Sequence, residues 1–434
     1  MKDDFDEIIG YENVKKRLRM ISDMLKMPEG YRQPNGLMPS GILFEGWPGV
    51  GKTTMARCLI ASSGRKYFSC IIKGSQEEFL DSIRNTFKEA EKAAPSIVFI
   101  DDLDEFVDDF DEMVDDLDKF VPADQSHPDA DAFVTLQSCM DDVKGKDVFV
   151  IATAWESYKL PVSLFRHGRL EEIIHLTLPE GQDRVHIFSH YLSASGLTEN
   201  INPVLLANLL DGESCGTIKN TVERACEKAV SHHQKKISTH DLIEAYVDER
   251  IGYNGCKIPP YPIEEVIRGA YHESAHAVVS EVLRPGSVVL MTVKPAGFGH
   301  LGFTKRKIDH AGQKTFSDYE WNIKTALAGE AADELFPGYR DRGVSSDRDY
   351  FPLRLDALID AVCDYDLQNH EFTREFKING KNKNSLIYAL ISSCYKEVKQ
   401  ILASHRKQVD RIAEKLAQKE TLFYPEIRKI MTGF

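Results

Sequence analysis

The chain has 434 residues, of which 42% are hydrophobic and 28% are charged, and its formal net charge is −14. This length predicts two or three domains, and the composition is that of an ordinary soluble globular protein. The negative charge argues against nucleic acid as a partner. The sequence contains no apolar run of about 18 residues, so no membrane span is predicted, and residues 1–6 do not resemble a signal peptide. The eight cysteines form no C-x-x-C pair, which indicates reduced thiols in a cytoplasmic protein.

A phosphate-binding loop follows the first predicted strand. Residues 1 to about 40 are polar and helical in pattern, and residues 42–44 form a short buried strand. The strand leads into a G-x-x-x-x-G-K-T loop and a helix predicted over residues 54–61. In such a loop, backbone N–H groups surround a phosphate, the lysine faces the β and γ phosphates of ATP, and the threonine hydroxyl binds Mg²⁺. The predicted nucleotide-binding residues are Gly46, Trp47, Pro48, Gly49, Val50, Gly51, Lys52, Thr53 and Thr54.

A second buried strand, residues 96–100, ends in two acids, and a third is predicted at residues 148–152. An acid at the end of such a strand holds Mg²⁺ through water, and we assign this role to Asp101. Asp102 is predicted to orient the water that attacks ATP.

The segment from Asp101 to Asp118 contains 11 acids and no lysine or arginine. Its apolar residues recur at helical spacing, which predicts an amphipathic helix. Its acidic face is either solvated or a docking surface for a basic partner.

Residues 271–277 hold an H-E-x-x-H motif within a helical pattern. His272 and His276 are four residues apart, so they lie one turn apart on the same face of a helix and can reach one metal ion. Zinc suits imidazole ligands, and it lowers the pKa of a water in its open position. Glu273 is placed to take the proton of that water as general base and to deliver it to the leaving amine. A solvated helix with incidental histidines is the alternative, which the alanines and valines at 275–279 disfavour.

A catalytic zinc site needs a third protein ligand, which spacing alone does not identify. The candidates are Glu330, Asp333, Glu334 and Asp347. Strands are predicted at residues 287–293 and 301–304, and an edge strand near zinc can pair with an extended peptide. Residues 385–434 are helical in period.

Taken in order, these motifs resemble the FtsH family of AAA+ zinc proteases. The phosphate loop, the I-V-F-I-D-D strand end, F-R-H-G-R at 165–169 and H-E-S-A-H at 272–276 carry the resemblance, which runs from about Phe5 to the C-terminus. It implies an α/β AAA+ P-loop ATPase module with a small helical lid domain, followed by a mostly α-helical zinc metalloprotease domain. The expected boundaries are 1–178 for the nucleotide-binding domain, 179–253 for the small helical domain, 254–262 for a linker and 263–434 for the protease domain. The implied cofactors are Zn²⁺, ATP and Mg²⁺.

The resemblance also assigns roles that spacing leaves open. It makes Asp347 the third metal ligand beside His272 and His276, with Glu330 or Glu334 as supporting groups around the ligands. It implies that Arg166 and Arg169 act on the ATP of a neighbouring subunit. The chain is therefore expected to form a homo-oligomer, usually a hexameric ring.

Three positions depart from the family pattern. The family's Asp-Glu pair is Asp101-Asp102 here, its sensor asparagine aligns with Trp155, and its pore aromatic has no clear match, with residues 72–74 and Phe79 as candidates. Aspartate is one methylene shorter than glutamate, and tryptophan lacks the acceptor of an amide. These departures predict slow ATP turnover with ATP binding retained.

We therefore expect an ATP-dependent zinc endopeptidase that unfolds and degrades protein substrates. The alternative is a nucleotide-gated oligomeric assembly or adaptor with weak ATP hydrolysis and an ATP-independent peptidase activity. The family is commonly membrane-anchored, and no span is predicted here. The expected location is thus cytoplasmic, or at a membrane through a partner or adaptor.

Overall fold

The computed structural model describes residues 4–27, 38–70, 76–104, 128–196, 201, 203–252, 261–295, 301–307, 315–336 and 383–433. Contacts divide the chain into two compact units, one of residues 1–198 and 212–223, the other of residues 199–211 and 224–434. We call them unit 1 and unit 2. The candidate pore residues 72–74, the acidic segment beyond Asp104 and linker residues 254–260 lie outside the described ranges.

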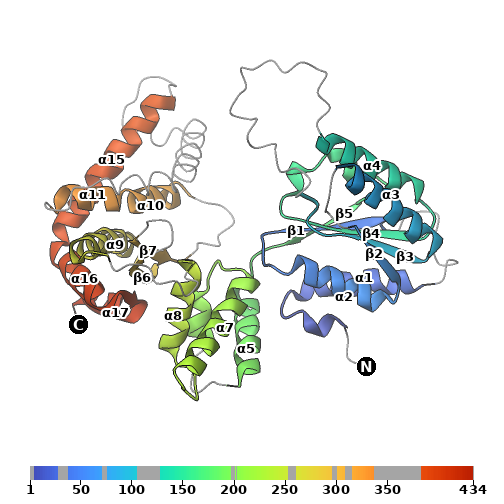
Figure 1. The fold of residues 1–434 in the computed structure, drawn as a ribbon. Helices are drawn as coiled ribbons and strands as arrows, with labels where there is room; N and C mark the ends of the chain where they lie inside the picture. The colour runs from blue at the N-terminus through green and yellow to red at the C-terminus, as the bar shows by residue number, and fades with distance from the viewer. Residues whose placement is uncertain are drawn as a thin grey trace. The chain divides into compact units, whose positions relative to one another are not determined.

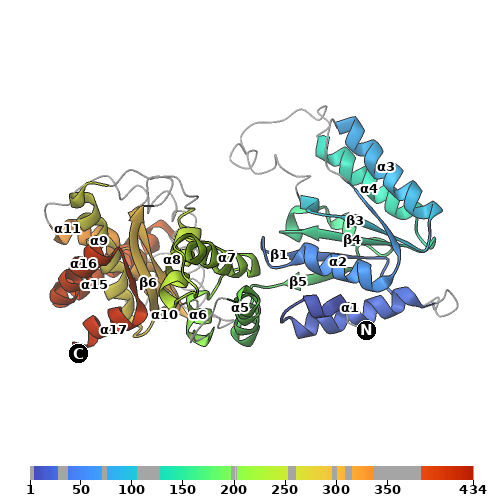
Figure 2. The ribbon, with the colours of Figure 1, turned by 60° about the horizontal axis from the view of Figure 1, so that its bottom comes forward.

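Unit 1 is built on a five-stranded parallel sheet in the order β2-β3-β4-β1-β5. Parallel neighbours need crossover connections, and helices supply most of them. Figures 1 and 2 show α1 and α2 on one face of the sheet and α3 and α4 on the other. The strands are β1 (Gly41–Gly46), β2 (Lys66–Ser69), β3 (Ser96–Ile100), β4 (Val148–Ala154) and β5 (Glu172–Leu176). The helices are η1 (Asp4–Glu7), α1 (Glu12–Lys26), α2 (Lys52–Ser63), α3 (Gln76–Lys92), α4 (Pro128–Asp142), η5 (Ser157–Lys159), η6 (Val162–Phe165), α5 (Gly181–Ser195) and the start of α7 (Cys215–Ser231).

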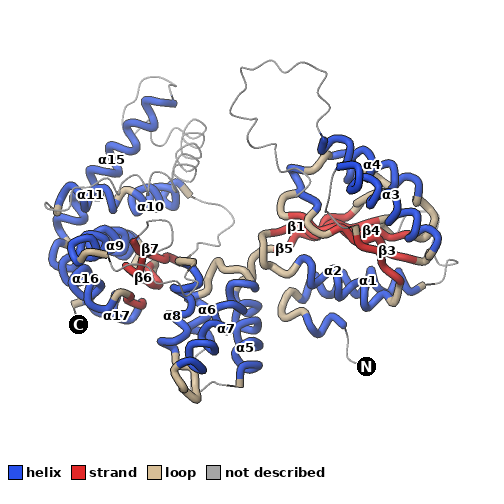
Figure 3. The backbone as a smooth tube through the Cα atoms, in the orientation of Figure 1, coloured by secondary structure: helices blue, strands red, loops and turns tan. Residues whose placement is uncertain are grey.

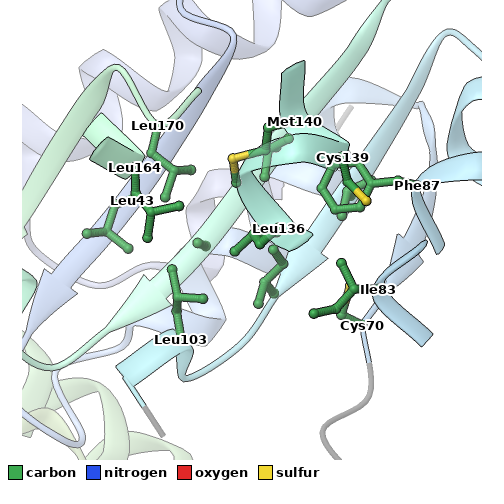
Figure 4. Packing of buried hydrophobic residues seen from close by; sticks show 14 of the residues in the cluster. Leu43, Cys70, Ile83, Phe87, Leu103, Leu136, Cys139, Met140, Leu164 and Leu170 are labelled. Atoms are coloured by element: carbon green, nitrogen blue, oxygen red, sulfur yellow. The ribbon is translucent and has the colours of Figure 1, made fainter. Parts of the chain in front are cut away.

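One hydrophobic core of unit 1 lies between the sheet and the pair α3–α4. Figure 4 shows members of this core, among them Leu43 of β1, Ile83 and Phe87 of α3, and Leu136 and Met140 of α4. Strands β3 and β4 are buried along their whole length because helices cover both faces. Such strands read as continuous apolar runs instead of alternating patterns. The strands predicted at 42–44, 96–100 and 148–152 are confirmed.

The order of the strands brings three carboxyl ends together. β4 pairs with both β1 and β3, so Thr153 lies opposite Phe44 and Ile100 lies opposite Ala152. In open parallel sheets, ligands bind in the crevice outside the carboxyl ends of the strands. The ends of β1, β3 and β4 thus mark one candidate site.

Unit 2 is mostly helical and contains a three-stranded antiparallel sheet in the order β7-β6-β8 (Figure 3). β6 (Val288–Pro295) and β7 (Leu301–Arg306) confirm the predicted pair of strands. The helical prediction for residues 385–434 holds for α15 (Lys383–Ser404), α16 (Arg406–Lys419) and α17 (Tyr424–Thr432), but it is wrong at β8 (Thr421–Phe423). The other helices are α6 (Pro203–Leu209), the end of α7, α8 (Thr239–Arg250), α9 (Ile263–Leu283), α10 (Phe316–Ala326) and α11 (Ala328–Leu335).

Helix α9 is central to unit 2, where it packs against α11, α16 and β6. Ala270, Ala275, Ala277 and Val278 of this helix are fully buried, and their small size lets neighbouring backbones approach closely. Among the described residues, none of the helices combines the length and the apolar character needed to span a bilayer.

Candidate functional site

The phosphate loop joins β1 to α2 through three glycines in unusual conformations. Gly46, Gly49 and Gly51 have φ angles of 153°, 79° and 104°, which side-chain-bearing residues rarely adopt. A Cβ on Gly49 would lie 2.6 Å from Ser214 Oγ, and Gly216 N–H donates to the Gly49 carbonyl at 2.9 Å. α2 begins directly after the loop, so its first N–H groups face the position that an anion would take.

The side chain of Lys52 folds back onto this loop. Its ammonium donates to the Gly46 carbonyl at 2.7 Å, and the residue is buried. Burial lowers the pKa of Lys52, and the nearby carboxylates of Asp102, Asp104 and Asp101 oppose that shift. A bound phosphate would offer this ammonium charged acceptors, which form stronger hydrogen bonds than a carbonyl.

Asp101 at the end of β3 is held by two hydroxyl groups. Thr53 Oγ1 donates to Asp101 Oδ1 at 3.0 Å, and Thr153 Oγ1 donates to the same oxygen at 2.6 Å. The hydroxyl of Thr153 also accepts the N–H of Asp102 at 2.8 Å. Thr53 and Asp101 thus bring together oxygen atoms of the kind that Mg²⁺ prefers. Thr153 belongs to no motif, but a buried threonine at the end of an apolar strand is a signal that could have found it.

Asp102 occupies a strained and partly buried position. Its φ is 49°, in the left-handed region that costs a non-glycine residue about 1–2 kcal/mol. Burial, followed by the charge of Asp101, raises the pKa of the Asp102 carboxyl. The predicted water-orienting group therefore differs from an ordinary aspartate in both conformation and acidity.

Trp155, in the turn after β4, lies beside Trp47 of the phosphate loop. Their ring centroids are 5.5 Å apart, and the residues are 39% and 56% exposed. The carboxylate of Asp104 accepts the backbone N–H of Trp155 at 2.6 Å, which fixes the turn after β4. The indole of Trp155, which aligns with the sensor asparagine of the family pattern, thus lies beside an indole of the phosphate loop.

The two arginines of the F-R-H-G-R segment have different surroundings. Arg169 forks onto Asp141 at 3.0 and 2.8 Å and also donates to Gln137 Oε1 and the Ser163 carbonyl. The hydrogen bond with Asp141 raises the pKa of Arg169 and lowers that of Asp141. Arg166 is exposed, and within the described part of the chain its guanidinium has no hydrogen bond or ion pair, although its carbonyl accepts the N–H of Arg169 at 3.1 Å. In this structure Arg169 binds within its own chain.

His272 and His276 of α9 point their Nε2 atoms at a common place. These atoms are 3.1 Å apart, and the rings are inclined at 72°. Two nitrogens on one tetrahedral zinc ion, each at 2.0–2.1 Å, would be about 3.3 Å apart. His276 Nδ1 lies 2.7 Å from the Thr325 carbonyl, which can only accept, so this nitrogen carries the proton and Nε2 presents its lone pair. The two imidazoles therefore fit a zinc ion.

Helix α11 contacts the imidazole ring of His272 and limits its position. A Cβ on Gly329 would lie 2.5 Å from His272 Nε2 and 2.7 Å from Nδ1, so the helix backbone lies directly against the imidazole. A side chain at this position would displace the ring. Gly329 was not among the predicted site residues, because nothing in its local sequence reveals a contact with a residue 57 positions earlier.

Glu273 is buried beside the two histidines, with only 7% of its surface exposed. Thr304 of β7 donates its hydroxyl to Glu273 Oε2 at 2.6 Å and to the Glu273 carbonyl at 3.2 Å. A buried carboxylate needs such a partner.

The predicted third metal ligand, Asp347, is not among the residues that the structure describes. Asp347 lies outside the described ranges, and within them no group of three or more His, Cys, Asp or Glu side chains is placed to hold a metal. Glu334 accepts from Tyr395 Oη at 2.9 Å and pairs with Lys399 at 3.2 Å, so its carboxylate faces α15. Of the three predicted metal ligands, the described residues thus include His272 and His276.

Comparisons with known proteins cover both candidate sites. Residues 42–178 match the AAA family, described as the ATPase family associated with various cellular activities. The chain is 27% identical to the ATP-dependent zinc metalloprotease FtsH 2 of Thermoanaerobacter sp. over 98% of its own length and 82% of that protein. It is 26% identical to the ATP-dependent zinc metalloprotease FtsH of Thermotoga maritima, with coverages of 99% and 73%, and to the YME1 homolog of Caenorhabditis elegans, with coverages of 99% and 61%.

Across these and similar relatives, the chain spans between 51% and 82% of the relative's length. The matched region nevertheless includes nearly every residue of this chain, from the segment before the phosphate loop to the helices after the H-E-x-x-H motif. The order of the two sites agrees with the parallel sheet of unit 1 and the mostly helical unit 2. Over nearly its whole length the chain therefore resembles ATP-dependent zinc metalloproteases of the FtsH type, and its residues 42–178 match the AAA family.

Proposed function

We propose that this chain is an ATP-dependent zinc endopeptidase that unfolds and degrades proteins. The observation that carries the proposal is the convergence of His272 and His276 Nε2 at 3.1 Å beside the buried carboxylate of Glu273. The phosphate loop in the same chain supports the dependence on ATP. The relatives' names, ATP-dependent zinc metalloprotease, support both parts.

At the metal centre, His272, His276 and Asp347 would hold the zinc ion. Zinc bound there supplies a Lewis acid and lowers the pKa of water. Glu273 would take one proton from the attacking water and later deliver it to the nitrogen of the leaving amine. Because Glu273 is buried, its carboxylate would meet that water in surroundings largely shielded from solvent.

At the nucleotide site, the backbone of residues 46–54 and the ammonium of Lys52 would bind the phosphates of ATP. Thr53 and Asp101 would hold Mg²⁺, and Asp102 would orient the attacking water. Arg166 and Arg169 would act on the ATP of the next subunit in a hexameric ring. The exposure of Arg166 supports this role, whereas Arg169 would first have to release Asp141.

We propose the domain boundaries that the sequence predicts, 1–178, 179–253, 254–262 and 263–434. β5 ends at Leu176 and α9 begins at Ile263, which supports the first and last of them. Protein substrates, a cytoplasmic location and tethering by a membrane or adaptor partner belong to the same proposal.

A second candidate is a nucleotide-gated oligomeric assembly or adaptor whose peptidase works without ATP hydrolysis. Two observations favour it: the raised pKa and left-handed backbone of Asp102, and the indole of Trp155 at the phosphate loop. Both would slow the hydrolysis of bound ATP while leaving the phosphate-binding loop intact.

The proposal is tested by comparing the natural chain with Glu273→Gln. We expect about one zinc per chain in both proteins by elemental analysis, and casein cleavage only in the first. Casein degradation is measured with ATP, with a non-hydrolysable analogue and without nucleotide. Equal rates in all three conditions would contradict ATP-driven unfolding and would favour the nucleotide-gated assembly. Folded protein without stoichiometric zinc would exclude the protease.

A further inference from the structure

We infer that Thr304 is a positioning residue for Glu273, and that helix α8 holds Thr304 in place through Lys305. The inference rests on the proposed function, because it concerns the general base of that reaction. All the residues involved belong to unit 2.

The hydroxyl of Thr304 contacts Glu273 at two points. It lies 2.6 Å from Oε2 and 3.2 Å from the backbone carbonyl, so one hydroxyl binds both ends of the residue. With Oε2 fixed, the direction of the second carboxylate oxygen is also set. A general base must lie within hydrogen-bond reach of the proton that it abstracts, and a misplacement of about 1 Å can cost about 10²-fold in rate.

Strand β7 presents Thr304 and Lys305 to opposite sides. Successive residues of a strand point to opposite faces of the sheet. Thr304, paired with Met291 of β6, reaches α9, whereas Lys305 reaches α8. Because the two residues are adjacent in the strand, the contacts of Lys305 with α8 also affect the position of Thr304.

Helix α8 binds both strands of the β6–β7 hairpin. Lys305 donates to Tyr246 Oη at 2.7 Å, and its ammonium is 5.0 Å from the centroid of that ring, which is fully buried. At the end of β6, Lys294 lies 3.5 Å from Glu244 and 3.6 Å from Asp248. These acids are two residues before and two residues after Tyr246, so one stretch of α8 holds the hairpin at two places.

These contacts form a short connection from α8 to the base. Tyr246 binds Lys305, the next residue along β7 is Thr304, and Thr304 binds Glu273. α8 lies in the segment predicted to close over the nucleotide, residues 179–253. A displacement of α8 would therefore move the general base without any change in the metal ligands.

The first test compares Thr304→Val, which removes the hydroxyl at nearly constant shape, with Thr304→Ser, which keeps it. We expect the valine variant to lose ten- to a hundredfold in kcat on a short fluorogenic peptide, with KM and zinc content unchanged, and serine to restore most of it. The matched control is Thr292→Val in the same sheet, whose hydroxyl binds the Glu420 carbonyl at 2.9 Å. This control should reduce thermal stability but not kcat.

The second test examines the connection to α8. Tyr246→Phe removes the acceptor of Lys305 and keeps the ring, so we expect a smaller loss of kcat. That loss should disappear in the Thr304→Val background, because both changes act through one hydroxyl. Full additivity of the two losses would separate α8 from the base and overturn this part of the inference.

Binding of a peptide hydroxamate, measured by calorimetry, provides a readout that does not require turnover. We expect it to weaken in Thr304→Val and to be retained in Thr304→Ser. If Glu273→Gln lacks cleavage and Thr304→Val equals the natural chain in both kcat and hydroxamate affinity, Thr304 has no positioning role while the proposed function stands. If the natural chain binds neither zinc nor the hydroxamate, the proposed function itself is wrong.

Discussion

Gly329 leaves the space that the imidazole of His272 fills. The nearest ring atoms would lie well inside van der Waals distance of any added Cβ. Because α11 is itself packed against α9 and α15, the helix cannot easily retreat to relieve the overlap. The ring would move instead, and the two Nε2 atoms would no longer face the same place.

We therefore expect Gly329→Ala to weaken zinc binding ten- to a hundredfold, the range seen when groups that orient metal ligands are removed. Competition with a chelator of known affinity measures this effect. Ala331→Gly is the control, since it destabilises the same helix by about 1 kcal/mol without approaching His272. Equal zinc affinity in Gly329→Ala and the natural chain would contradict the close approach of α11.

In the nucleotide-free protein, the ionised carboxylate of Asp102 lowers the stability of the fold, and the size of this effect depends on pH. Its pKa is raised in the folded state, mainly by burial, so folding disfavours the ionised carboxylate. The penalty is absent below the unfolded pKa of about 3.9, grows as the pH rises towards the folded pKa, and stays constant above it.

Asp102→Asn should remove this cost, because asparagine is neutral and also tolerates a left-handed backbone. We expect a higher melting temperature than the natural chain at pH 7 and no difference below about pH 4, the unfolded pKa. ATP hydrolysis should fall, since an amide cannot accept the proton of water. A lower melting temperature at pH 7 would show that the carboxylate stabilises the fold.

At the scale of elements, η6 and α4 are joined by Arg169. Its guanidinium binds Asp141 and Gln137 of α4 and the Ser163 carbonyl of η6. Arg166, three residues earlier, makes no such bond within the described part of the chain. Substitutions of Arg169 and Arg166 should therefore have different effects on stability and on ATP hydrolysis.

Arg169→Ala is expected to lower the free energy of unfolding by about 1–3 kcal/mol, because it leaves several acceptors without their donor. Arg166→Ala should change stability by less than about 0.5 kcal/mol, as surface substitutions do, yet reduce ATP hydrolysis. Denaturant titration and an ATPase assay of the two variants measure these effects. Intact hydrolysis in Arg166→Ala would remove its role across a subunit boundary.

The sequence predicted elements well where one physical pattern dominates. Residues 96–100 and 148–152 are continuous apolar runs and are buried strands. β8 could not be predicted, because three residues between two helices carry no period, and their strand exists through pairing with β6. In the same way, motifs predict Lys52 and His272 as site residues, because the chemistry sets their spacing, whereas Thr153, Thr304 and Gly329 depend on contacts between distant segments.

At the scale of the whole molecule, the proposed function assigns separable reactions to the two sites. The metal centre would cleave any extended peptide that reaches it, whereas a folded protein must first be unfolded. Lys52→Ala is therefore expected to abolish ATP hydrolysis and degradation of a folded protein while zinc content and cleavage of a short peptide remain. Parallel assays of the two substrates measure this difference, and loss of peptide cleavage in Lys52→Ala would show that the metal centre needs bound nucleotide.

The position of the tryptophans has a practical consequence. The chain has three, and two of them, Trp47 and Trp155, form the exposed pair at the phosphate loop. The third, Trp321, is buried in unit 2 between the guanidinium groups of Arg284 and Arg306. Its replacement by phenylalanine would leave tryptophan fluorescence that arises only from the pair at the phosphate loop. Arrival and departure of ATP could then be followed in real time without an attached dye.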